Sequence, residues 1–64
     1  MAIKLVYKTD TGEIKAIADN PKIDINKLMS NWTDVDWIET DKPITFEVIR
    51  YFRVNPITRE LEKI

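Results

Sequence analysis

"AIKLVYKTDTGEIKAIA", residues 2–18, is the stretch that decides the fold. Apolar and polar residues alternate on both sides of "TDTG", with the period of a half-buried β-strand. Asp10 and Gly12 favour a turn between the two runs, because glycine takes a left-handed backbone conformation without steric cost. We therefore predict a β-hairpin over residues 2–18. The apolar face of its second strand should consist of Ile14, Ala16 and Ala18.

The whole chain has 64 residues, with neither cysteine nor histidine. A domain of this size buries only about 60% of the surface that its unfolded chain exposes, so it usually needs a disulfide, a metal ion or a partner. The composition removes disulfides and the commonest zinc ligands, which leaves association with another chain. It also removes the imidazole and thiol groups of most acid–base and nucleophilic catalysis. We expect one domain, residues 1–64, that is not an enzyme and has no cofactor and no metal site.

Charge and hydropathy indicate the surroundings of the protein. The net charge is −1, which gives no general attraction to nucleic acid or to anionic membranes. No apolar run exceeds 3 residues, so the sequence predicts neither a membrane span nor a signal peptide. We expect a cytoplasmic protein, or a component of a particle that is assembled in the cytoplasm.

The middle of the chain favours a short helix. Pro21 biases the residue before it away from helical geometry, so the segment after the hairpin should be a loop. "NKLMSNW", residues 26–32, then predicts about two helical turns over residues 25–31, capped by Asp24 or Asn26.

"DVDWIETD", residues 34–41, carries four carboxylates and alternates like a strand. Val35 and Trp37 should then face the core, with the acidic side chains in water. Calcium needs about six to eight oxygen ligands gathered by a curled loop, which an extended strand does not provide. We interpret the stretch as a solvated strand face, with weak cation binding as the alternative and catalysis by paired carboxylates as a third, less favoured one.

"ITFEVIRYFRV", residues 44–54, is rich in β-branched and aromatic residues and predicts a strand. A helix stays open as an alternative, because apolar residues also recur at helical spacing after Pro43. Both faces of such a strand would be apolar, as in a strand covered on both sides. One short helix can cover only one face, so the second face needs either closure of the sheet into a small barrel or another subunit. Because a single glycine gives few places for the sharp bends of a barrel, we expect a homo-oligomer or a docked component of a larger assembly, with residues 44–54 at or near the contact.

"NPITREL", residues 55–61, aligns with "KTDTGEI", residues 8–14, and predicts a second hairpin. Asn55 followed by Pro56 is a strong turn opener. Arg59 stands where the first turn has glycine, so the second turn is not expected to copy the first. The predicted fold is a β-rich α+β domain of about five antiparallel strands, in two hairpins plus a central strand, with one short helix.

Two sets of residues are candidates for contacts with a partner. The first set would serve protein interaction: Trp32, Phe46, Val48, Tyr51 and Phe52. The second set would serve the alternative function, a small β-rich module that binds nucleic acid through bases interleaved with aromatic residues. It consists of Arg50, Tyr51 and Arg53 with the hairpin lysines Lys4, Lys8 and Lys15.

Two segments resemble parts of short accessory proteins found among phage and prophage structural genes. "KLVYKTDTGEIKAIADN", residues 4–20, is similar to the start of such proteins. "FRVNPITRELE", residues 52–62, resembles hairpins of tail-associated proteins, with Arg59 in place of the usual glycine. The resemblance implies a structural subunit of a particle and assigns no functional residues.

Overall fold

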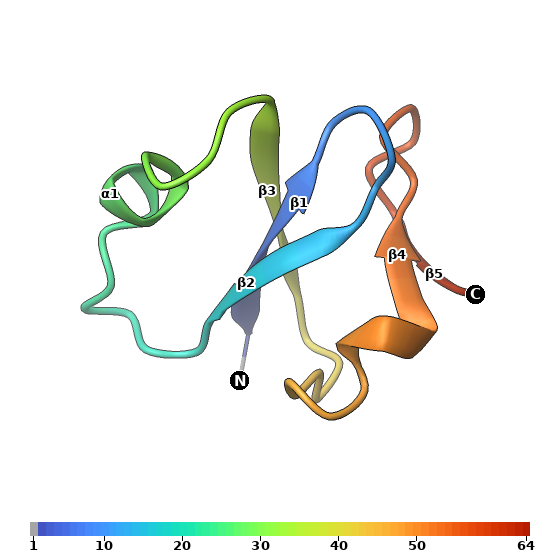
Figure 1. Cartoon of the computed structure of the whole chain (residues 1–64). Helices are drawn as coiled ribbons and strands as arrows, with labels where there is room; N and C mark the ends of the chain where they lie inside the picture. The colour runs from blue at the N-terminus through green and yellow to red at the C-terminus, as the bar shows by residue number, and fades with distance from the viewer. Residues whose placement is uncertain (1) are drawn as a thin grey trace.

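The computed structural model describes residues 2–64, which form five antiparallel strands, one short helix and one 3₁₀ turn (Figure 1). The elements in chain order are β1 (Ile3–Lys8), β2 (Ile14–Ala18), α1 (Ile25–Met29), β3 (Val35–Thr40), the 3₁₀ turn η1 (Ile49–Tyr51), β4 (Phe52–Val54) and β5 (Leu61–Lys63). The strands form a three-stranded sheet in the order β2-β1-β3 and a two-stranded sheet of β4 and β5. The predicted β-rich α+β fold is confirmed.

Strand β1 lies at the centre of the larger sheet and is buried on both faces. Leu5, Val6 and Tyr7 are 0%, 0% and 1% exposed. Successive residues of a strand point to opposite faces, so Leu5 and Tyr7 lie on one face and Val6 on the other. Figure 1 shows α1 on one side of the sheet and the β4–β5 hairpin on the other. The strand that is covered on both sides is therefore β1, and its second cover comes from the same chain.

The main core fills the space between the larger sheet and the C-terminal part of the chain. Its buried members are Leu5, Tyr7, Ile14, Ile38, Ile44 and Val54. Leu5 pairs with Ile38 across β1 and β3, so these two side chains share the core face. The prediction that Val35 and Trp37 of β3 face the main core is wrong. Both side chains are only partly buried and lie on the α1 side of the sheet. The reason is the pairing with β1, in which Trp37 lies opposite Val6, on the face that α1 covers.

A β-bulge divides the apolar residues of β2 between the two faces of the sheet. The register shifts between Val6 and Tyr7, so that Tyr7 pairs with Ile14 while Val6 pairs with Ala16. The extra residue of the bulge is Lys15, which reverses the direction of every side chain after it. The predicted single face of Ile14, Ala16 and Ala18 is therefore wrong: Ile14 joins the main core and the two alanines face α1.

Helix α1 begins where the sequence predicted. Asp24 is its N-cap, and the carboxylate accepts hydrogen bonds from the N–H groups of Asn26 (3.0 Å) and Lys27 (3.3 Å). The helix ends at Met29, slightly earlier than predicted. The Asn31 and Trp32 N–H groups then bond to carbonyls three residues back, which is the tighter 3₁₀ pattern common at helix ends.

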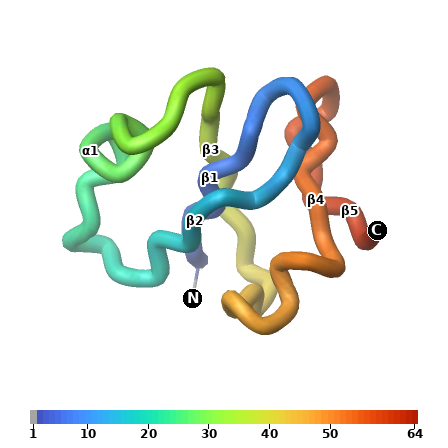
Figure 2. Tube along the Cα trace, in the orientation of Figure 1, coloured from blue at the N-terminus to red at the C-terminus, as the bar shows by residue number. Residues whose placement is uncertain are grey.

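Residues 44–51 do not form the predicted strand, and only Phe52–Val54 is extended. The Val48 and Ile49 N–H groups both donate to the Thr45 carbonyl (3.1 Å each), which winds the chain into a turn that leads into η1 (Figure 2). This turn directs the apolar side chains toward the main core: Ile44 is buried in it, and Val48 and Ile49 pack against it. The argument for a partner that rested on a two-faced apolar strand is therefore wrong.

The two hairpin turns share one hydrogen-bond pattern. In the first, Lys8 N–H donates to Glu13 O (2.9 Å) and Gly12 N–H donates to Lys8 O (2.7 Å). In the second, Asn55 takes the place of Lys8, donating to Glu60 O (2.8 Å) and accepting from Arg59 N–H (2.7 Å). The predicted second hairpin is confirmed.

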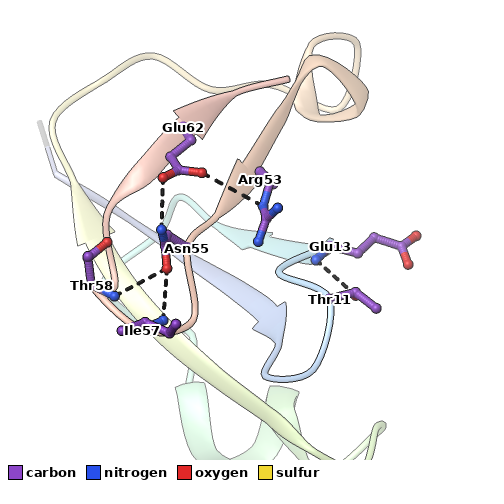
Figure 3. A network of polar contacts seen from close by, with 7 residues as sticks. All are labelled: Thr11, Glu13, Arg53, Asn55, Ile57, Thr58 and Glu62. Atoms are coloured by element: carbon purple, nitrogen blue, oxygen red, sulfur yellow. Dashed lines mark hydrogen bonds and ion pairs between the residues drawn. The ribbon is translucent and has the colours of Figure 1, made fainter.

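Arg59 also shares the left-handed conformation of Gly12, with φ angles of 60° and 79°. The backbone of the second turn therefore does copy the first, and the two turns differ in the type of residue at this position. The Asn55 side chain supports the second turn, because its Oδ1 accepts hydrogen bonds from the N–H groups of Ile57 (2.9 Å) and Thr58 (3.3 Å), as Figure 3 shows.

Two substitutions of Arg59 distinguish the energetic cost of its left-handed backbone from the stabilisation by its side-chain contacts. The guanidinium donates to Trp37 O (2.9 Å) and lies 3.6 Å from Asp36 Oδ2, so it fastens the second hairpin to the outer edge of β3. We expect Arg59→Ala to lower the free energy of unfolding by about 1 kcal/mol, through loss of these contacts. Arg59→Gly loses the same contacts but also relieves about 1 kcal/mol of left-handed strain, so it should be nearly neutral. Urea denaturation of both variants checks this, and equal values for the two would contradict the strain argument.

Candidate protein-interaction site

A groove lies where the turn of the first hairpin meets the C-terminal part of the chain. The two parts are joined by a hydrogen bond from Val54 N–H to Gly12 O (2.9 Å). The hollow beside this junction has a volume of about 430 Å³. Its apolar lining consists of Ile14, Ile49, Phe52 and Ile64. The hairpin turn therefore supplies one wall, and η1, β4 and the residue after β5 supply the other.

Two arginines line the groove, and nearby carboxylates neutralise their positive charge only in part. Arg50 and Arg53 both reach it, and the acid in its lining is Glu13. Glu13 is itself paired with Lys15, with 3.2 Å between Oε2 and Nζ. Arg53 Nε lies 3.9 Å from Glu62 Oε2 and is buried without a hydrogen-bond partner within residues 2–64. In Figure 3, Arg53 lies between Glu62 and the turn that carries Thr11.

Glu62 is shared between two neighbours. Its Oε1 accepts a hydrogen bond from Asn55 Nδ2 (2.9 Å), while its Oε2 faces Arg53 at the longer ion-pair distance. The stronger contact of Glu62 is thus the one that holds the second turn. Because the Asn55 amide is neutral, Glu62 still balances the charge of Arg53. The positive character of the groove therefore comes from Arg50, which makes no ion pair within residues 2–64.

Three exposed apolar side chains surround η1, and we call them the C-terminal apolar surface: Phe46, Tyr51 and Ile64. Phe46 is 70%, Tyr51 50% and Ile64 77% exposed. Ile64 lies beside η1 because its N–H donates to Tyr51 O (2.7 Å). A further exposed residue, Ile57 (91%), lies in the second turn, at the other end of β4.

The residues predicted for protein interaction divide into two groups. Phe46 and Tyr51 are exposed and belong to the C-terminal apolar surface. Val48 and Phe52 are partly buried and pack against the core, although Phe52 also lines the groove. Trp32 is partly buried and follows α1, an element on the other side of the larger sheet from β4 (Figure 1).

The basic residues of the nucleic-acid alternative do not share one surface. The Lys4 ammonium lies 5.1 Å from the centre of the Trp37 ring, and Lys8 Nζ donates to Thr33 O (3.1 Å). Both lysines extend from the face of β1 that carries Val6, opposite to the face covered by the C-terminal hairpin. Arg50 and Arg53 are at the groove, and the Arg50 guanidinium lies 5.1 Å from the centre of the Tyr51 ring.

The acidic stretch 34–41 is mostly a wet surface, as predicted. Asp34, Glu39 and Asp41 are exposed. Asp36 is partly buried: its Oδ1 accepts the Trp37 N–H (2.8 Å) and its Oδ2 faces Arg59. Within residues 2–64, no three acidic side chains gather as ligands for a metal ion.

Sequence reasoning missed the groove residues Thr11, Glu13, Ile14 and Ile64. The first three come from the turn of a hairpin whose position against β4 has no local signal. Ile64 was within reach of prediction, because pairing β5 with β4 returns the chain to Tyr51.

Comparisons with protein-family models, curated proteins and solved structures gave no match. The resemblance to phage accessory proteins therefore stays a prediction. Within residues 2–64, α1 is far too short to cross a bilayer, and no other helix qualifies as a membrane span.

Proposed function

We propose that the protein is a non-enzymatic interaction module that self-associates, or docks into a larger assembly, through the C-terminal apolar surface. The exposure of Phe46, Tyr51 and Ile64 around a single turn carries this proposal. Aromatic side chains are enriched in the cores of protein interfaces, where they supply a large contact area. Isolated apolar residues are ordinary on protein surfaces, but three around one turn of so small a domain indicate a contact region.

The cellular setting that we propose is a structural particle, as the resemblance to phage accessory proteins implies. A subunit of such a particle needs contact surfaces rather than a catalytic centre. The lack of histidine and cysteine in the sequence is compatible with that role.

Light scattering behind a sizing column, over a series of protein concentrations, tests self-association. We expect the native chain to exceed the monomer mass and the double variant Phe46→Ser, Tyr51→Ser to elute as a monomer. Ile57→Ser is the control, because it removes an even more exposed apolar side chain (91%) that lies outside the C-terminal apolar surface. A native chain that stays monomeric at every concentration would contradict self-association.

The alternative, a nucleic-acid-binding module, draws on Arg50, Arg53 and the exposed Tyr51 ring. It has less support, because Lys4 and Lys8 lie on another face and Lys15 pairs with Glu13. Fluorescence anisotropy with a single-stranded oligonucleotide separates the two functions. Binding that weakens steeply with salt would favour the alternative, whereas apolar association is unchanged or strengthened by salt.

A further inference from the structure

We propose that the groove binds a peptide segment of a partner protein in which a carboxylate lies next to a large apolar side chain. This inference rests on the proposed function and names the partner chemistry of the groove beside the C-terminal apolar surface. It follows from the size of the groove, its apolar lining and its two arginines.

The size and lining of the groove suit a few side chains of an extended segment. Its volume of about 430 Å³ falls in the lower part of the range of small-ligand pockets, about 300–1,000 Å³. Ile14, Ile49 and Ile64 give it a mainly aliphatic lining, which takes an apolar side chain. Phe52 is the one aromatic residue in the lining, and it is partly buried and packed against the core, so a nucleic-acid base has little ring surface on which to stack.

The arginines of the lining favour a peptide that has a carboxylate next to that apolar side chain. Arg50 lies in the lining and makes no ion pair within residues 2–64, and the Arg53 side chain is 41% exposed although its Nε is buried. A carboxylate from a partner can accept two hydrogen bonds from one guanidinium, which is the strong form of this contact. Because Glu62 balances the charge of Arg53 and Lys15 that of Glu13, Arg50 leaves the lining with one unbalanced positive charge. Charge complementarity therefore favours an acidic segment over a basic or neutral one.

Selection from a random-peptide library displayed on phage tests this chemistry without choosing a ligand in advance. On the native chain, we expect the recovered peptides to be enriched in Asp or Glu next to Leu, Ile, Phe or Trp. The variant Arg50→Gln, Arg53→Gln should lose this enrichment. By fluorescence anisotropy, it should bind the best recovered peptide about five- to tenfold more weakly than the native chain does.

Arg59→Gln is the matched control, because it removes one arginine outside the groove and should keep the enrichment. Recovery of no sequence pattern, or of a pattern without acids, would overturn the inference. Loss of self-association in the Arg50→Gln, Arg53→Gln variant would also overturn it, since a second copy would then occupy the groove. Failure of self-association gives a different result: the native chain stays monomeric and nevertheless selects acidic peptides. Failure of the proposed function as a whole would leave a monomeric chain that selects no peptide.

Discussion

Gly12→Ala should lower the free energy of unfolding by about 2–5 kcal/mol, which is about half of the stability expected for a domain of this size. The left-handed conformation of Gly12 (φ 79°) costs an alanine about 1–2 kcal/mol. A Cβ there would also overlap the Val54 carbonyl oxygen, and overpacking of this kind costs about 1–3 kcal/mol. Because a backbone carbonyl cannot rotate away as a side chain can, the turn must shift and the Val54–Gly12 hydrogen bond must lengthen.

Urea and thermal denaturation followed by circular dichroism measure this loss. A chain of 64 residues is stable by only about 3–10 kcal/mol, so the variant is expected to be partly unfolded at room temperature. Asp10→Ala is the control, because Asp10 lies in the same turn and is exposed. A Gly12→Ala chain with native stability would mean that the first turn does not rest against β4.

Val6→Asp should abolish folding, because it places an unpaired carboxylate on the second buried face of β1. Val6 is fully buried on the α1 side. Lys4 and Lys8 lie on the same face, but their ammonium groups are at the Trp37 ring and at Thr33 O, so an ionised group at position 6 is left without a partner and costs several kcal/mol. If one face of the sheet were open to solvent, aspartate at this position would point into water and cost little. The variant therefore tests whether the chain covers both faces of its own central strand.

Two further substitutions keep this test interpretable if Val6→Asp does not fold. Val6→Thr has the same shape and adds only a hydroxyl, which should cost about 1–3 kcal/mol in a site without a hydrogen-bond partner. Val35→Asp lies on the same face, is only partly buried and pairs with Lys8, so it should cost about 1 kcal/mol or less. Val6→Thr with native stability would contradict two-sided burial.

The elements that could be predicted from the sequence are those with local signals. The first hairpin has alternating apolar and polar residues around a glycine, the helix has Asp24 as a cap, and the second hairpin has Asn55 followed by Pro56. Each signal acts within a few residues, so tertiary contacts had little to change. The face of the sheet to which each β2 side chain points was harder to predict. The bulge at Lys15 reverses these directions, and nothing in the alternation of apolar and polar residues indicates it.

Residues 44–51 were predicted wrongly as a strand, because composition and spacing disagree there, whereas Phe52–Val54 is extended as predicted. β-branched and aromatic residues favour a strand, but the helical spacing of Ile44, Val48 and Phe52 was the signal that matched the core. The run of apolar residues that did report two-sided burial is Leu5–Val6–Tyr7. Three consecutive apolar residues in an alternating strand are a better sign of a central strand than a longer segment of mixed composition.

The groove could not be predicted, since its walls come from residues far apart in the chain. The arginines around Tyr51 and Phe52 were singled out, but their partner wall is the turn at Thr11–Ile14. The hydrogen bond between Gly12 and Val54, together with the packing of Ile14 and Val54 in one core, brings these parts together.

The way the core is covered has a consequence for the order of folding during synthesis. The first hairpin leaves the ribosome early, yet Leu5 and Tyr7 are covered by Ile44 and Val54, which are made much later. Until then the nascent sheet has an uncovered apolar face and is prone to aggregate or to engage a chaperone. Native structure should therefore form only after translation has passed residue 54, in a single late step.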